Sequence, residues 1–131
     1  MQRGGSMSSF LIVNGVEFPT PSRGFKITVV TNVDAGVNAS GAVVGQVIGR
    51  NQYKLDSMKW DGLDAETWER MLQAVEPFYV PVTFEDPQTR KRKTITMYPG
   101  NRSGEPYWLD EDKKIKWYRS CQFNLIDCGW E

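Results

Sequence analysis

Hydrophobic and polar residues alternate along much of this chain, and the alternation predicts β-strands. Between Phe25 and Val33, apolar side chains recur at odd positions with mainly polar residues between them. Segments 78–84 and 117–125 repeat this period. Because successive side chains of a strand point to opposite faces, each segment is expected to bury one face and expose the other. Arg119 is the exception on the inward parity of the last segment.

Turn residues separate these segments. Asn14 and Gly15 stand between two short apolar runs, and this pair is preferred in a two-residue hairpin turn, where both residues take positive φ. Asp86 and Pro87 occupy the favoured first two positions of a type I turn, which leads into a returning strand at residues 93–98. The pattern therefore predicts hairpins at both places.

Other breaks in the pattern predict loops, an edge and a bulge. Residues 34–41 are small and polar and are expected to form a long mobile loop, and residues 99–106 form a second loop. Pro81 lacks a backbone donor, which places its strand at the edge of a sheet. A β-bulge near Asp56 and Ser57 would reconcile the apolar parities on the two sides of that point.

One segment has the period of a helix. Its apolar residues at helical spacing are Trp68, Met71, Leu72 and Val75. Asp64 is suited to cap the free N–H groups of the first turn, and Pro77 ends the segment. We therefore predict an amphipathic helix at about residues 64–76, docked on a sheet through its apolar stripe.

The order of these elements predicts a mainly β fold: an antiparallel β-sandwich or barrel of about seven strands with one amphipathic helix packed on it. The 131 residues and 40% hydrophobic content suit a single β domain at residues 11–131. Residues 1–10 are expected to be a mobile N-terminal segment or a remnant of a cloning tag. No apolar run spans a bilayer and no signal peptide opens the chain, so we expect synthesis in the cytoplasm and no membrane partner.

The side-chain inventory argues against catalysis. Histidine is absent, which removes the commonest general base and the commonest metal ligand. The run Asp110-Glu111-Asp112 has carboxylates but not the spacing of a calcium loop, so a solvated turn is its expected role. Cys121 and Cys128 are expected to be reduced thiols, with Cys121 in the core. We predict no enzyme, no metal site and no cofactor.

Charge and aromatic residues nominate candidate interfaces. The 16 basic and 16 acidic residues cancel, so a charged partner must be met locally. The strongest cluster consists of Arg90, Lys91, Arg92 and Lys93. Three interpretations of this cluster are open. It prevents edge-to-edge association of the hairpin, it docks a protein partner or, as the least expected role, it contacts nucleic acid.

Among the tryptophans, two are candidates for an interface. Trp60, Trp68 and Trp117 occupy core-like positions in the predicted strands and helix. Trp108 and Trp130 are less constrained by the pattern, so they are free to contact a partner or to stack on a base or sugar.

A set of turn and core motifs runs through the chain from about Val13 to Ile126. The motifs are NGVEFPTP at 14–21, NASG at 38–41, MLQAVEP at 71–77, VTFEDPQT at 82–89, MYPGNRS at 97–103 and WYRSCQFNLI at 117–126. Together they resemble a family of small proteins encoded in the tail-morphogenesis regions of phages and prophages of Gram-positive bacteria. The expected fold is also similar to that of tail-tube and distal-tail proteins, whose subunits assemble into rings.

The resemblance implies a structural role without catalytic residues. It points to Asn38 and Ser40 in the expected loop, to the basic hairpin at residues 90–93 and to the Pro81 edge as surfaces for contacts between subunits. The leading hypothesis is a component of the virion tail that self-associates, with a ring as one arrangement, and docks to other tail proteins. The alternative is a small ligand-binding β module that uses Trp108 or Trp130 for a glycan or nucleic acid.

Overall fold

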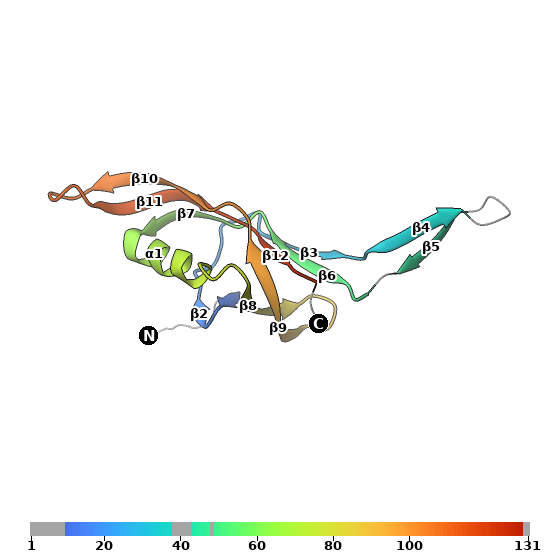
Figure 1. Ribbon diagram of the computed structural model, residues 1–131. Helices are drawn as coiled ribbons and strands as arrows, with labels where there is room; N and C mark the ends of the chain where they lie inside the picture. The colour runs from blue at the N-terminus through green and yellow to red at the C-terminus, as the bar shows by residue number, and fades with distance from the viewer. Residues whose placement is uncertain (1–9, 38–42, 48, 130–131) are drawn as a thin grey trace.

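The computed structural model describes residues 10–37, 43–47 and 49–129, and within them the chain is mostly β-structure with one helix (Figure 1). The elements in chain order are β1 (Leu11–Val13), β2 (Val16–Glu17), β3 (Lys26–Val30), β4 (Val33–Val37), β5 (Val43–Val47), β6 (Gln52–Asp56), β7 (Lys59–Asp64), α1 (Ala65–Ala74), β8 (Val80–Asp86), β9 (Lys91–Pro99), β10 (Ser103–Leu109), β11 (Ile115–Gln122) and β12 (Leu125–Asp127).

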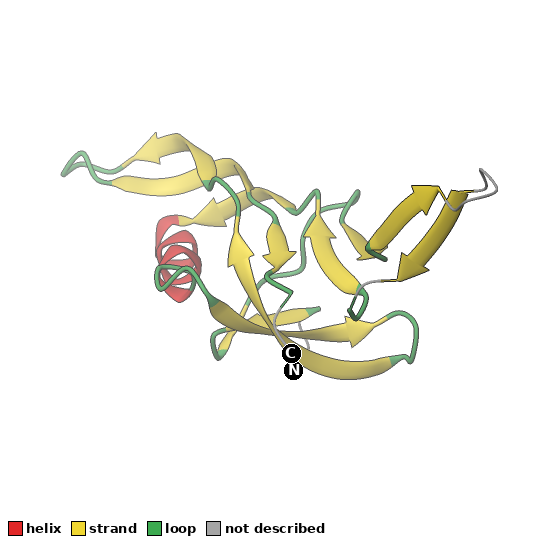
Figure 2. Ribbon diagram, turned by 45° about the vertical axis from the view of Figure 1, so that its right-hand side comes forward, coloured by secondary structure: helices red, strands yellow, loops and turns green. Residues whose placement is uncertain are grey.

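The strands form two main sheets and one separate hairpin (Figure 2). The larger sheet has seven strands in the order β2-β1-β8-β9-β12-β6-β3, the smaller has the order β10-β11-β7, and β4 pairs with β5. All of these pairings are antiparallel. The predicted mainly β class with a single helix is confirmed, and the barrel is excluded because the sheets do not close.

Three neighbouring strands pass from one sheet into the other and bend at the same level. β6 is followed by β7, β9 by β10 and β11 by β12, so β9, β12 and β6 of the larger sheet correspond to β10, β11 and β7 of the smaller one. Asn124 joins the bends, since its side-chain oxygen accepts from Ser57 N at 3.0 Å and its carbonyl accepts from Gly100 N at 2.9 Å. Ser57 has a φ of 57°, and the buried side chains change from odd-numbered to even-numbered positions between Leu55 and Met58. The predicted bulge near Ser57 is found at this bend.

Two hairpins, β4–β5 and β10–β11, project as arms at opposite ends of the molecule (Figure 1). Both contain segments that we expected to be loops. Residues 34–37 lie in β4 and residues 103–106 in β10, so the loop predictions were wrong there, and residues 38–41 lie outside the described part. Backbone hydrogen bonds form a hairpin ladder without needing apolar side chains, which is why polar composition misled the prediction.

The core is built around four aromatic rings. They are Phe18, Trp60, Trp68 and Phe123, each at most 4% exposed. The ring centroid of Phe123 lies 5.6 to 6.2 Å from the other three. Helix α1 packs against β11, β7 and β2, so it covers the interior between the small sheet and one end of the large sheet. Large buried rings of this kind dominate the packing free energy of a small domain.

Helix α1 begins as the sequence predicts and ends slightly early. The carboxylate of Asp64 accepts from Thr67 N at 3.3 Å and from Thr67 Oγ1 at 2.6 Å, which caps the first turn. Trp68, Met71 and Val75 of the predicted stripe are buried. The helix ends at Ala74 instead of residue 76, and turns then lead to β8. Among the described residues, no helix is long and apolar enough to span a bilayer.

Pro81 does not mark an edge, which corrects that prediction. Strand β8 lies between β1 and β9, in the interior of the large sheet. The carbonyl oxygen of Pro81 accepts a hydrogen bond from Asn14 N at 2.8 Å. The backbone N and carbonyl of Pro81 therefore face the turn that follows β1, and they do not face β9. Because β1 ends at Val13, the missing N–H of proline interrupts no ladder there.

Some apolar residues at positions that the alternation predicts to be buried remain partly or largely exposed. Phe25, Ile27 and Val29 are only partly buried, because β3 is the edge strand of the large sheet. Val33 is 51% exposed at the start of the β4–β5 arm. Phe78 is 41% exposed and lies before β8, with a φ of 76°. Alternation therefore located the strands but did not establish which of them are covered.

Candidate functional site

Three of the candidate interface residues, Asn38, Ser40 and Trp130, lie outside the described residues. The others fall on two separate elements. The basic cluster is on the β8–β9 turn and at the start of β9, whereas Trp108 is on β10, in the arm beyond the bend. The structure therefore does not bring the basic cluster and Trp108 into one site.

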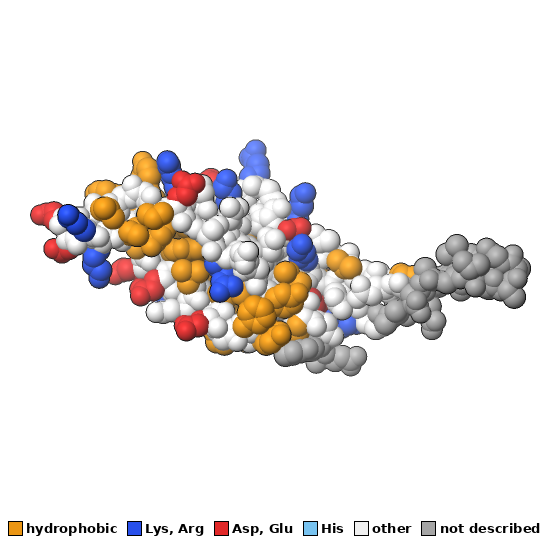
Figure 3. Space-filling model, turned by 45° about the horizontal axis from the view of Figure 1, so that its top comes forward, with side chains coloured by type: hydrophobic (Ala, Val, Ile, Leu, Met, Phe, Trp, Pro, Cys, Tyr) orange, Lys and Arg blue, Asp and Glu red, His pale blue; other side chains and the backbone are white. Residues whose placement is uncertain are grey.

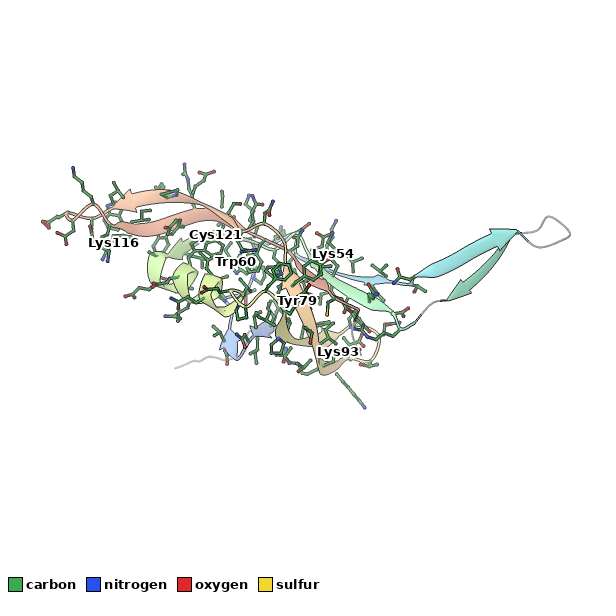
Figure 4. The ribbon with its side chains drawn as sticks, viewed as in Figure 1. Lys54, Trp60, Tyr79, Lys93, Lys116 and Cys121 are labelled. Atoms are coloured by element: carbon green, nitrogen blue, oxygen red, sulfur yellow. The ribbon has the colours of Figure 1, made fainter. Side chains whose placement is uncertain are left out.

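The basic cluster divides into an exposed part and a bound part. Arg90 and Lys91 are exposed, and the exposed Arg92 donates from Nη1 to the carbonyl of Phe10 at 3.2 Å. Lys93, labelled in Figure 4, is half-buried. Its Nζ lies 3.3 Å from Asp86 Oδ2 and 4.6 Å from the centroid of the Tyr53 ring. Of the four cations, Arg90 and Lys91 are the most available to a partner, and Lys93 serves the fold.

Asp86 is the centre of a buried polar network. Its carboxylate accepts from Gln88 N at 2.9 Å and from the Tyr53 hydroxyl at 2.8 Å, and it pairs with Lys93. Burial by itself would raise the pKa of Asp86, but these hydrogen bonds and the lysine outweigh burial, so the pKa lies below its usual value. The network fastens the β8–β9 turn to β6.

Asp127 anchors a second network on the same sheet. It forms a two-pronged ion pair with Arg50, at 2.6 and 2.8 Å, and accepts from the backbone N–H groups of Tyr53 and Gly129. Burial would raise the pKa of Asp127, but the bonds from Arg50 and the two amides lower it below its usual value. Sequence reasoning missed both buried aspartates, because nothing local distinguishes them from exposed ones.

An open groove with a volume of about 1280 Å³ lies between α1 and the β10–β11 arm. Its apolar and aromatic lining consists of Trp68, Leu72, Trp108, Ile115, Trp117 and Tyr118. Figure 1 shows the arm extending past the helix, and Figure 4 places Lys116 on the outer part of that arm. The groove is thus formed by two elements that the small sheet connects.

The two walls of the groove carry opposite charges. Glu66 and Glu69 lie at helical spacing on α1, Glu76 lies in the turn after the helix, and all three are exposed. The facing wall holds Lys113, Lys114 and Lys116 of the arm, which are also exposed, together with Arg102 and one carboxylate, Asp110. We call the glutamates the acidic stripe and the lysines the lysine wall. Within the described part of the chain no ion pair joins them.

The arm also exposes large apolar side chains. They are Tyr107, Trp108, Leu109 and Trp117, which are 38–61% exposed. Figure 3 shows hydrophobic side chains gathered over this end of the molecule. The predicted exposure of Trp108 is confirmed. An exposed apolar surface on a projecting hairpin is a feature of interaction sites and is uncommon on the surface of a monomer.

Trp117 was expected in the core, and that prediction was wrong. Its indole lies across Gly62 of β7, where an added methyl group would come within 2.9 Å of Trp117 Nε1. Ser120 has a φ of 54°, and the inward position is taken by Tyr118, whose ring lies 6.5 Å from that of Trp68. This local irregularity of β11 breaks the alternation that the sequence pattern assumed.

The same irregularity explains the position of Arg119. Strict alternation would place this residue inside, yet it is exposed. Its guanidinium lies 4.8 Å from the centroid of the Tyr107 ring and its Nε lies 3.4 Å from Glu105 Oε1. Both contacts are with β10, so Arg119 holds the two strands of the arm together on their outer face.

A second exposed aromatic group lies where α1 leads into β8. Phe78 stacks on Tyr98 with ring centroids 5.3 Å apart, and Tyr79 meets both rings edge-on, at 4.9 and 6.2 Å. Tyr79 is 50% exposed. Phe78 holds a positive φ, which is unfavourable for a bulky side chain. The aromatic group therefore offers a second apolar surface for a protein partner.

Asp110 organises the turn at the end of the β10–β11 arm. Asp110 accepts from the N–H groups of Asp112 and Lys114, both at 2.9 Å, and so closes the turn of the arm. Within the described part, no three or more Asp, Glu or Cys side chains are grouped to hold a metal ion. Burial raises the pKa of the Cys121 thiol to about 11, so this cysteine stays protonated.

Comparisons with known proteins identified no relative. The chain matches no protein-family model, no curated protein and no solved structure.

Proposed function

We propose that this protein is a structural subunit of a bacteriophage or prophage tail, which works by self-association and by docking to other tail proteins. It has no enzymatic activity and requires no cofactor in this role. It is made in the cytoplasm of the bacterial host and resides in the virion tail. The proposal rests on the motifs that resemble the phage tail-region family, together with the surface of the β10–β11 arm.

The exposed apolar surface of the arm is the observation that carries the proposal. Tyr107, Trp108 and Leu109 are consecutive residues of β10, and each is more than half exposed. Neighbouring side chains of a strand point to opposite faces, so both faces of the arm expose apolar area. Burying one such side chain against a partner contributes about 1.5 to 3 kcal/mol. Aromatic residues of this kind are enriched at the centres of protein interfaces.

The shape of the molecule supports assembly through separate surfaces. The β4–β5 arm and the β10–β11 arm extend in opposite directions (Figure 1). Contacts between different surfaces of identical subunits close into rings when the rotation between neighbours allows it. Arg90 and Lys91, and the aromatic group around Phe78, remain as surfaces for other tail proteins.

Size-exclusion chromatography with light scattering tests the proposal across a range of concentrations. We expect masses that are multiples of the 15.0 kDa chain, and negative-stain electron microscopy should then show discrete assemblies. Replacing Tyr107 and Trp108 by serine is expected to reduce the assembled fraction, because the apolar interface area is lost.

A matched control uses an exposed aromatic residue away from the arm. Phe10 is 57% exposed, similar to Tyr107 at 59%, and Phe10→Ser should leave assembly unchanged. A wild-type chain that remains a monomer at every concentration and binds no tail protein from a co-expressed panel would contradict the proposal.

One observation favours a second function, a small ligand-binding β module. Trp108 lines the same groove as Glu66 and Glu69 of the facing helix, and an exposed indole in a groove that also holds carboxylates is suited to stacking on a sugar ring. Glycan and oligonucleotide arrays distinguish the two functions. Specific binding that is lost in Trp108→Ala would support the ligand-binding module, and its absence would leave the structural role.

A further inference from the structure

The charged walls of the groove are unpaired within one molecule. The acidic stripe has three carboxylates and the lysine wall has three ammonium groups, and all six side chains are exposed. The ion pairs of the described residues are elsewhere, at Arg50, Lys54, Lys93 and Arg119. Each set of charges is therefore available to a partner of the opposite sign.

The two walls are held apart by the packing at the base of the arm. An added methyl group at Gly104 would lie 3.2 Å from both Trp68 Nε1 and Cys121 Sγ, so β10 runs close against the helix tryptophan there. β11 is also paired along most of its length with β7, which leads directly into α1. Moving the lysine wall onto the acidic stripe of the same chain would require bending this packed three-stranded sheet.

We propose that the groove is occupied by the β10–β11 arm of a second copy of this chain. The lysine wall of each copy then meets the acidic stripe of the other, and the exposed side chains of Tyr107, Trp108 and Leu109 are covered in the same contact. This inference rests on the proposed function, since it specifies the surface through which the chain self-associates. Each molecule has both an arm and a groove, and in the contact that we propose each copy places its arm in the groove of the other, which is a two-fold arrangement.

Charge complementarity selects a second copy over other partners. The acidic stripe and the lysine wall have opposite signs and belong to the same chain, so a second copy supplies the opposite charge to each of them without any further component. A nucleic acid would meet the lysines but would be repelled by Glu66, Glu69 and Glu76 on the facing wall. A purely apolar peptide would leave both sets of charges desolvated and unpaired.

Charge reversal tests the contact by analytical ultracentrifugation at low salt. One variant carries Glu66→Lys, Glu69→Lys and Glu76→Lys, and the other carries Lys113→Glu, Lys114→Glu and Lys116→Glu. Each is expected to raise the dissociation constant at least about tenfold, because three attractive pairs become repulsive. Added salt should weaken the wild-type contact in the same direction.

Mixing the two variants provides the decisive measurement. In the mixture, the reversed acidic stripe of one variant faces the reversed lysine wall of the other. The unchanged lysine wall of the first variant faces the unchanged acidic stripe of the second, so both sets of pairs are attractive again, one of them with opposite polarity. We expect a species of twice the 15.0 kDa chain mass that neither variant forms alone. If the mixture stays monomeric, the charges do not act between copies and the inference is overturned.

Control variants separate this inference from the proposed function. Arg23→Glu, Lys26→Glu and Lys59→Glu together reverse three exposed cations outside the groove and should leave the dissociation constant unchanged. Far-UV circular dichroism verifies that each variant is folded, and neutral Gln or Ser replacements at the same positions provide a milder series. Wild-type self-association that neither reversal weakens would refute the groove contact and leave the tail role standing. A wild-type chain that never self-associates would also refute the groove contact. If that monomer still binds other tail proteins, the proposed tail role stands.

Discussion

At the scale of single residues, burial and hydrogen bonding decide what each polar or reactive group does. Lys93 illustrates this, because a basic side chain in a run of four cations is bound to a buried carboxylate. Cys121 and Cys128 illustrate it too, since one thiol is fully buried and the other is partly exposed. These differences lead to predictions about reactivity and about acid stability.

Only one of the two cysteines should react with a thiol reagent in the native protein. Burial raises the pKa of Cys121 to about 11 and removes it from solvent, whereas Cys128 is partly exposed. Titration with a chromogenic disulfide is expected to modify one thiol per chain in buffer and two in denaturant. Cys128→Ser should abolish the native reaction, and rapid modification of both thiols in the folded protein would contradict the buried position of Cys121.

Asp127 should make the protein sensitive to acid. Its folded-state pKa is lowered, so its stabilising contribution is present above the unfolded pKa of about 3.9 and is lost as the pH falls through the folded value. Asp127→Asn is expected to lower the free energy of unfolding by roughly 1.5 to 3 kcal/mol at pH 7, because Arg50 loses a charged partner.

Urea unfolding at pH 7 and pH 3 measures this effect. The variant should lose less stability than the wild type between the two pH values, since it lacks the carboxylate that becomes protonated. Asp61→Asn, at an exposed aspartate on β7, is the matched control and should follow the wild type. Equal acid sensitivity of Asp127→Asn and wild type would show that Asp127 does not contribute.

At the scale of elements, the helix is stable only because it docks. Ten residues form a marginal helix in water, so α1 depends on the burial of its apolar stripe. Trp68 contributes the most to this face, because its ring contacts Phe123 of the central aromatic group and Tyr118 of β11. The small sheet and the helix therefore stabilise each other, and the groove between them depends on that contact.

Trp68→Ala should destabilise the protein by about 3 to 5 kcal/mol, the usual cost of removing a buried large aromatic side chain. A thermal or urea melt monitored by far-UV circular dichroism measures the loss. Trp108→Ala is the matched control, since Trp108 is 61% exposed and its removal should change stability by no more than about 0.5 kcal/mol. A Trp68→Ala variant that melts like the wild type would remove Trp68 from the core.

At the scale of the whole molecule, the two sheets are one cooperative unit. The same three neighbouring strands run through both sheets and bend together at Ser57, Gly100 and Asn124. Neither sheet can lose its order without breaking strands that the other shares. The exposed arms, in contrast, project beyond this unit and present the surfaces through which we propose that copies assemble.

Unfolding of a dilute monomer should therefore occur in a single transition. Four of the five tryptophans, Trp60, Trp68, Trp108 and Trp117, belong to or adjoin the small sheet. In a Trp130→Phe variant the fluorescence therefore reports on that half, whereas far-UV circular dichroism reports on all strands. We expect the two signals to change at the same urea concentration. Fluorescence that changes at a clearly lower concentration would show that the small sheet and α1 unfold separately.

Much of the fold could be predicted from local patterns, but less of the candidate site. The hairpin at Asn14 and Gly15, the Asp64 cap and the helix stripe depend on neighbours in the chain, and each is found as expected. The groove depends on α1 and a hairpin arm that begins in a segment of apparently loop-like composition. Its acidic stripe was visible in the sequence only as ordinary solvated charges.

The sequence by itself determined that this is a mainly β chain with one capped, amphipathic helix, because side-chain periodicity and turn chemistry act over a few residues. Only the tertiary structure decided that Pro81 is interior, that Trp117 is exposed and that Lys93 is bound to Asp86. Those outcomes depend on which distant strands pair and where three of them bend. Pairing between distant segments is a property of the whole chain, so the local pattern, which correctly left Trp108 exposed, could not reveal that Trp117 is exposed or that Lys93 is bound.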